Sequence, residues 1–142
     1  CDAVAAASIR TRESLRDTEQ RIADLALLGK QIDTYRKLKP VYDRYKASKD
    51  KEKFLRGFES EIILFEAAAR EIKKAGLTRL PSSDKVKAEL EGLSARKAAL
   101  QAELRKIQRE EKEYDTLRQN VDALLERPKE QEQQRQRSND LE

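Results

Sequence analysis

Residues 54–75 read FLRGFESEIILFEAAAREIKKA, and their apolar positions recur with the spacing of an α-helix. Steps of three and four residues alternate along one row of side chains: Leu55, Phe58, Ile62, Phe65, Ala69 and Ile72. This heptad spacing is typical of helices that pack along their length. Ser48 or Asp50 can cap the start of such a helix, and Gly76 is expected just past its end. The stretch therefore predicts a helix over about 50–75.

Three further apolar residues of this stretch, Phe54, Ile63 and Leu64, lie outside the heptad row. They widen the apolar surface, so we expect this helix to be buried on two sides. If Phe58 and Phe65 are buried as the row requires, alanine at either position should cost about 3–5 kcal/mol of stability.

Two longer periodic segments flank this helix and predict helices over about 2–38 and 83–126. The first carries Leu15, Ile22, Leu25, Ile32 and Tyr35 at helical spacing. The second carries a heptad row that polar residues interrupt three times: Val86, Leu90, Leu93, Lys97, Leu100, Leu104, Ile107, Glu111, Tyr114, Arg118, Val121 and Leu125. Proline lacks an N–H group, so Pro40 and Pro128 are expected to end or kink these helices. Residues 129–140 contain no apolar residue, so the sequence predicts a disordered tail over 128–142.

The composition predicts an all-α fold in a helical domain over residues 1–127. Charged residues make up 41% of the chain and aromatic residues 5%, which is unfavourable for strands. We favour a long, antiparallel, coiled-coil-like helical hairpin, with residues 40–81 folded as a helical tip. The alternative is an up-down-up three-helix bundle. In that arrangement the end of the third helix extends beyond the other two helices. Tyr114, Val121 and Leu125 would then have to be covered by a second chain.

The chain lacks the residues that most enzymes use. It contains no histidine and one cysteine, which excludes a histidine base, a disulfide framework and a cysteine-rich zinc site. The four glycines are scattered singly, so there is no phosphate-binding loop. We therefore expect no catalytic residue, no cofactor and no bound metal. No apolar run approaches the roughly 20 residues of a membrane span.

Basic residues concentrate in a tip region over about 30–56. Ten basic and four acidic residues there give a net charge of +6, whereas the whole chain carries +4. Cations with interleaved tyrosines suit a phosphate backbone and unstacked bases. The alternative is that the tyrosines are core residues and the lysines merely solubilise the tip. The candidate nucleic-acid-binding residues are Lys30, Arg36, Lys37, Lys39, Tyr42, Arg44, Tyr45, Lys46, Lys49, Lys51 and Lys53.

Three stretches carry a resemblance to a known family. Residues 35–54 read YRKLKPVYDRYKASKDKEKF, residues 58–82 read FESEIILFEAAAREIKKAGLTRLPS, and residues 119–128 read QNVDALLERP. Together they resemble the C-terminal helical region of relaxases, the mobilisation nucleases of conjugative plasmids and other mobile genetic elements, especially of Gram-positive gut bacteria. The resemblance covers about two thirds of the chain. It is a match to a helical region, which is less specific than a catalytic motif.

The resemblance implies an accessory role in DNA mobilisation. Relaxases nick DNA with a tyrosine and a histidine-rich metal site, and a chain without histidine cannot contain that site. None of the four tyrosines is therefore expected to be a nucleophile. The expected partners are DNA, with weak sequence specificity, and relaxosome or coupling proteins in the bacterial cytoplasm. A second copy of the chain is a further expected partner, in a homodimer formed through helix 83–126.

Two other functions remain open from the sequence. One is a coiled-coil protein-interaction module with no role at DNA, which the interrupted heptads favour. The other is a lipoprotein spacer anchored at Cys1, because bacterial lipoproteins mature with an N-terminal lipidated cysteine. The absence of an initiator methionine also fits a C-terminal fragment of a relaxase.

Overall fold

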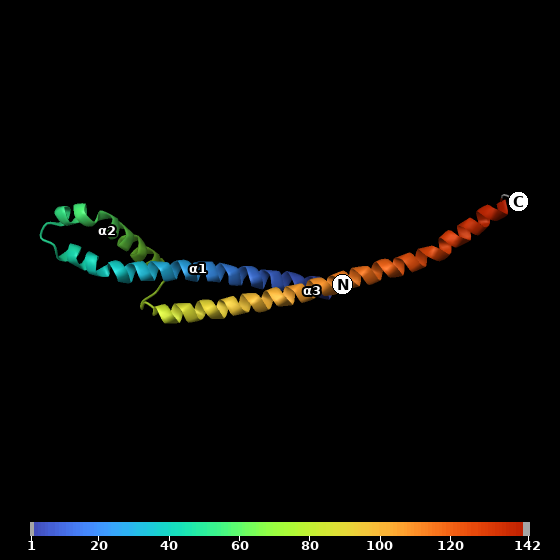
Figure 1. Cartoon of the computed structure of the whole chain (residues 1–142), viewed down its shortest axis with the longest axis horizontal. Coiled ribbons are helices and arrows are strands. Elements are labelled where there is room, and N and C mark those ends of the chain that lie inside the picture. The colour runs from blue at the N-terminus through green and yellow to red at the C-terminus, as the bar shows by residue number, and fades with distance from the viewer. Residues whose placement is uncertain (1, 141–142) are drawn as a thin grey trace. The chain divides into compact units, whose positions relative to one another are not determined.

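The computed structural model describes the backbone of residues 2–140 and the side chains of residues 2–126. It contains three helices, which Figure 1 labels: α1 (Asp2–Ala47), α2 (Lys51–Lys74) and α3 (Ser83–Asp140). No strand occurs over the described backbone. The predicted all-α fold is confirmed. Among the described residues, no helix is both long enough and apolar enough to cross a bilayer.

The chain divides into two compact units, each of which has its own packing. The tip unit comprises Arg16–Ala98, and the terminal unit comprises Cys1–Leu15 with Ala99–Glu142. In the tip unit, α2 folds back along α1, and the start of α3 lies along another side of α1 (Figure 1). The terminal unit combines the first turns of α1 with the continuation of α3. These arrangements are consistent with the helical hairpin and with the three-helix bundle.

The core of the tip unit is formed by all three helices. Its buried apolar residues are Ile32, Ile62, Phe65, Ala68, Ile72 and Val86. α1 and α3 approach each other closely at Gly29, where an added Cβ atom would lie 3.2 Å from Cγ1 of Val86. A glycine at this point therefore lets the two helices pack with little space between them.

The terminal unit has a smaller apolar core. Ile107 of α3 is buried there, and so are Ser8 and Thr11 of α1. Small hydroxyl residues thus occupy interior positions where the sequence pattern offered no large apolar residue. This unit buries few large side chains, so we expect it to open at a lower free energy than the tip unit.

The predicted boundaries of α2 agree with the structure. The carboxylate of Asp50 caps the helix by accepting a hydrogen bond from the Lys53 N–H at 3.1 Å. Beyond the helix, Gly76 adopts a φ of +72°, and its N–H donates to the Lys73 carbonyl at 3.0 Å. Left-handed backbone of this kind is most accessible to glycine, so Gly76 stops the helix as expected.

The predicted packing of α2 is wrong in two respects. At Phe58 the backbone leaves the helical region (φ −135°, ψ 27°), and this kink leaves the side chain half-buried. Ile63 and Leu64 are each 55% exposed, so the helix is not buried on two sides. The reason is that α1 covers one face of α2 and no other described segment of the tip unit covers the opposite face.

Neither proline ends its helix, so the predicted boundaries near residues 38 and 126 are wrong. α1 continues through Pro40 to Ala47, and α3 continues through Pro128 to Asp140. Proline removes one hydrogen bond of the helix, to the carbonyl four residues earlier. After Pro40, Tyr42 and Tyr45 pack against α2 and offset that loss. After Pro128, the sequence is rich in Glu, Gln, Lys and Arg, which are good helix formers.

The backbone of residues 128–140 is helical, so the disordered tail predicted over residues 128–142 is wrong for that part of the chain. The backbone is described only to Asp140, and the side chains beyond Glu126, together with residues 141–142, lie outside the described residues.

Two glycines should respond oppositely to alanine. Gly92 lies inside α3, and an added Cβ atom would meet nothing within 4 Å, so Gly92→Ala should stabilise the protein by about 0.5–1 kcal/mol. Gly76→Ala should destabilise it by about 1–2 kcal/mol, because alanine is strained at positive φ. Urea denaturation followed by circular dichroism measures both effects, and shifts of the same sign would contradict these placements.

Candidate nucleic-acid interface

A short turn connects α1 to α2 and carries the most exposed part of the basic region. The Ser48 N–H donates to the Tyr45 carbonyl at 3.2 Å, and the Ser48 hydroxyl donates to the Asp50 carbonyl at 3.1 Å. With the Asp50 cap of α2, these bonds fix the turn. The backbone that carries the neighbouring lysines therefore has a defined conformation.

Four cations surround this turn, and we call them the distal cations: Lys49, Lys51, Lys53 and Arg56. All four are exposed. Over the described side chains, none of them makes an ion pair, a hydrogen bond from its charged group or a cation–π contact. Two acidic residues, Asp50 and Glu52, lie among them, so the local net charge is +2. These charges are free to meet an anion without breaking an existing contact.

Two more of the sequence-predicted cations are exposed and unpaired among the described residues. Lys30 and Lys37 are seven residues apart on α1 and so share one face of the helix. Lys30 lies about 24 Å along the helix from Lys46, at 1.5 Å per residue. Lys30 therefore lies far along α1 from the turn, and the structure does not gather all the predicted residues into one patch.

Three predicted cations have partners within the tip unit. Lys39 forms an ion pair with Asp43 at 3.1 Å. The guanidinium of Arg44 lies 5.6 Å from the ring centre of Phe58. The ammonium of Lys46 lies 5.6 Å from the ring centre of Tyr42. These contacts are exposed and individually weak, but an anion would have to compete with them.

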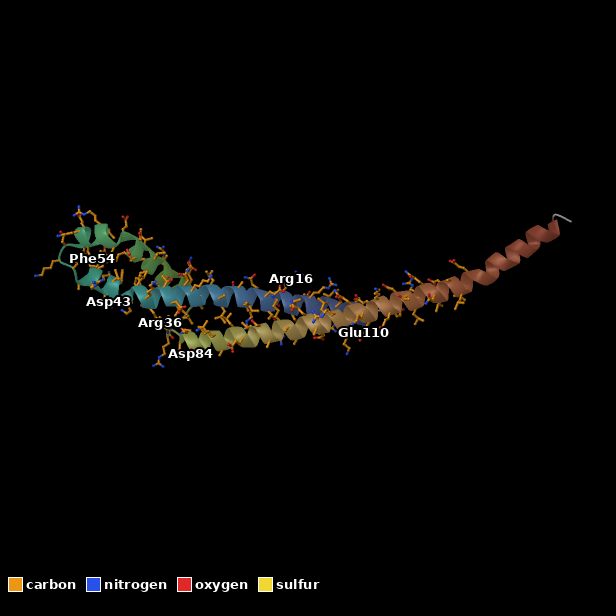
Figure 2. The ribbon with its side chains drawn as sticks, in the orientation of Figure 1. Arg16, Arg36, Asp43, Phe54, Asp84 and Glu110 are labelled. Carbon is orange, nitrogen blue, oxygen red and sulfur yellow. The ribbon has the colours of Figure 1, made fainter. Side chains whose placement is uncertain are left out.

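Arg36 is bound to the connector between α2 and α3. Its guanidinium donates to the Pro81 carbonyl at 2.6 Å and to the Leu80 carbonyl at 3.3 Å. Figure 2 shows Arg36 on α1 beside the start of α3, where Asp84 is labelled. One turn away, the hydroxyl of Ser83 donates to Asp33 at 3.2 Å. Arg36 therefore has a structural partner that the sequence did not reveal.

The two predicted base-stacking tyrosines belong to an aromatic cluster between α1 and α2. Tyr42 stacks on Phe65 with ring centres 4.3 Å apart, and Tyr35 stacks on the same ring at 4.7 Å. Tyr45 lies 6.0 Å from Tyr42 and 6.1 Å from Phe54. Both Tyr42 and Tyr45 are half-buried. This arrangement favours a packing role for the two rings over stacking on bases.

A second row of cations lies on α3 in the terminal unit. Arg105, Arg109 and Lys112 line a shallow groove of about 330 Å³ together with Gln108. Over residues 103–115, however, four basic residues are outnumbered by five acidic ones, so the net charge is −1. This row is therefore less suited to a polyanion than the distal cations are.

One groove of the tip unit is mainly apolar and differs in chemistry from both groups of exposed cations. It has a volume of about 470 Å³, and leucines of α1 and α3 line it: Leu25, Leu27, Leu28 and Leu93. Its rim has mixed charge, with Glu71 and Lys74 forming an ion pair at 3.4 Å. The groove offers no concentration of one charge that would select an ionic ligand.

In comparisons with known proteins, no family model, no curated protein and no solved structure matches this chain. Cys1, on which the lipoprotein expectation depends, lies outside the described residues. Among the described residues, no group of three or more His, Cys, Asp or Glu side chains gathers as a metal site would require.

Proposed function

We propose that this chain is a non-catalytic helical segment that contacts DNA through the distal cations. The observation that carries the proposal is that Lys49, Lys51, Lys53 and Arg56 are exposed, unpaired in the described structure and gathered at one fixed turn. Cations of this kind bind phosphate and release its counterions, which favours binding without strong sequence preference.

The resemblance to relaxases supports a role in DNA mobilisation. In this proposal the chain is an accessory part of a bacterial cytoplasmic relaxase. It helps to hold DNA or docks relaxosome and coupling proteins, while nicking takes place in another domain.

The salt dependence of DNA binding tests the proposal. Fluorescence anisotropy of labelled single-stranded and duplex DNA should be measured with the full 142-residue chain at 50 mM and 200 mM salt. If all four distal cations contact phosphates, the slope of log K against log salt for duplex is about −3.6, which weakens binding about 10²-fold over this range. Absence of binding at 50 mM salt, or an affinity that does not change with salt, would refute the proposal.

A coiled-coil interaction module is the second candidate function. The observation that favours it is a set of exposed apolar residues on α3 in the terminal unit: Tyr114, Leu117, Val121, Leu124 and Leu125. A module without a role at DNA would associate through these residues and show no salt-dependent DNA affinity. The anisotropy measurement therefore distinguishes the two candidates.

A further inference from the structure

The apolar residues of α3 at the end of its contact with α1 and beyond it form a distinct surface, which we call the distal stripe: Tyr114, Leu117, Val121, Leu124 and Leu125. Their exposed fractions are 49%, 61%, 46%, 62% and 67%, respectively. The first four are separated by steps of three, four and three residues, so they share one face of the helix. Large apolar residues aligned in this way are typical of a surface that another helix covers.

The distal stripe continues an interface that already exists within the chain. Ile107 is buried in the terminal unit, and Val4 and Ala5 of α1 line a small cavity together with Tyr114 of α3. Beyond Tyr114, no described segment of this unit covers the face that carries Leu117, Val121 and Leu124, as their exposure shows. The apolar row that α1 covers at Ile107 thus extends further along α3 without a partner.

We propose that a second copy of this chain covers the distal stripe and forms a short, parallel, two-stranded coiled coil with it. In heptad terms, Tyr114 and Val121 occupy a positions, and Leu117 and Leu124 occupy d positions. A β-branched residue at a with leucine at d favours parallel dimers. Val121 at an a position, with Leu117 and Leu124 at d positions, fits this rule, whereas Tyr114 at the other a position is not β-branched.

Charges beside the stripe favour the parallel orientation. Glu113 is at a g position and Arg118 at the following e position, and these two positions face each other between the strands of a parallel coiled coil. The dimer thus gains two symmetric pairs of opposite charge. An antiparallel pairing of Leu117 with Val121 would instead place the Arg118 side chains of both copies at one edge of the interface, where like charges repel.

The inference is independent of the proposed contact with DNA, since the distal cations belong to the tip unit and the distal stripe to the terminal unit. The stripe spans little more than one and a half heptads, so the dimer should be weak. Analytical ultracentrifugation of the full chain should show a monomer–dimer equilibrium that shifts with concentration. A chain that stays monomeric up to several hundred micromolar overturns the proposal.

Substitutions of exposed leucines test the location of the interface. Leu117→Ser with Leu124→Ser should weaken the dimer by about 10²-fold or more, because each copy loses two buried leucines. The matched control is Ile63→Ser with Leu64→Ser, which removes two aliphatic residues of similar exposure from α2. An equal loss of dimer in the control, or no loss in the Leu117/Leu124 variant, would show that the interface lies elsewhere.

Disulfide trapping tests the orientation in a Cys1→Ser background, which removes the single native cysteine. Facing d positions in a parallel dimer bring the two copies of residue 117 within disulfide range, so Leu117→Cys should form a covalent dimer on mild oxidation. Thr116→Cys is the control, because the adjacent position faces away from the partner. If Leu117→Cys crosslinks only when mixed with Val121→Cys, the strands are antiparallel and the proposed orientation is wrong.

Discussion

Phe65→Ala is expected to lower the free energy of unfolding by about 3–5 kcal/mol. Phe65 is 5% exposed, and its ring is stacked between Tyr35 and Tyr42 at centre-to-centre distances of 4.7 Å and 4.3 Å. Truncation leaves a cavity that two tyrosines of a continuous helix cannot readily fill. The free energy of unfolding of a small domain is about 5–15 kcal/mol, so this loss is a large share of the total stability. Urea denaturation followed by circular dichroism at 222 nm measures it.

Phe58→Ala is the matched control for this prediction. Phe58 is half-buried at the kink of α2, and its ring contacts Phe54 at 4.8 Å and the guanidinium of Arg44. Its loss should cost less than about 2 kcal/mol, because less apolar surface returns to water. The sequence predicted equal costs for both phenylalanines. If Phe65→Ala cost no more than Phe58→Ala, Phe65 would not be the centre of the tip unit.

The three helices could be predicted because their signals are local. Apolar residues recur every three or four positions, Asp50 precedes α2 as a capping residue, and Gly76 follows it at positive φ. Each of these features depends on residues within a few positions of one another. The sequence therefore predicted both ends of α2 to within one residue.

The helix ends at the prolines could not be predicted from local signals. Proline weakens a helix by removing one hydrogen bond, but packing of the turns beyond it can offset the loss. Beyond Pro40 that packing is between Tyr42 and Phe65, residues of different helices. A contact between residues 23 positions apart in sequence has no local signature, so the helix predicted from the sequence ends too early.

The same distinction applies to the candidate interface. The ion pair of Lys39 with Asp43 and the contact of Lys46 with Tyr42 both join residues four positions apart, so helical spacing alone could have identified them. The hydrogen bond of Arg36 to the Pro81 carbonyl joins residues 45 positions apart and depends on how the helices fold together. Counting charges along the sequence overestimated the number of free cations for this reason.

The distal cations should account for most of the affinity for DNA. In a variant with Lys49, Lys51, Lys53 and Arg56 all changed to Glu, we expect binding at 50 mM salt to weaken by about 10²-fold or more. The slope of log K against log salt should become shallower by about 3.6, since four phosphate contacts are lost. Fluorescence anisotropy with the same labelled DNA measures both quantities.

The variant should remain folded, because its four side chains are exposed and make no ion pair in the described structure. Glutamates at positions 51 and 53 lie in the first turn of α2, where negative charge interacts favourably with the helix dipole. An unchanged thermal melt by circular dichroism therefore separates lost binding from lost structure.

The matched control changes four exposed cations of α3 to Glu: Arg105, Lys106, Arg109 and Lys112. Both variants alter the net charge by the same amount, so long-range repulsion of DNA should affect them similarly. Only the first variant removes cations that the tip unit leaves free around a fixed turn. A larger loss in the first variant supports direct phosphate contact there. Equal losses would mean that DNA responds to net charge alone, and the distal cations would then not be a binding site.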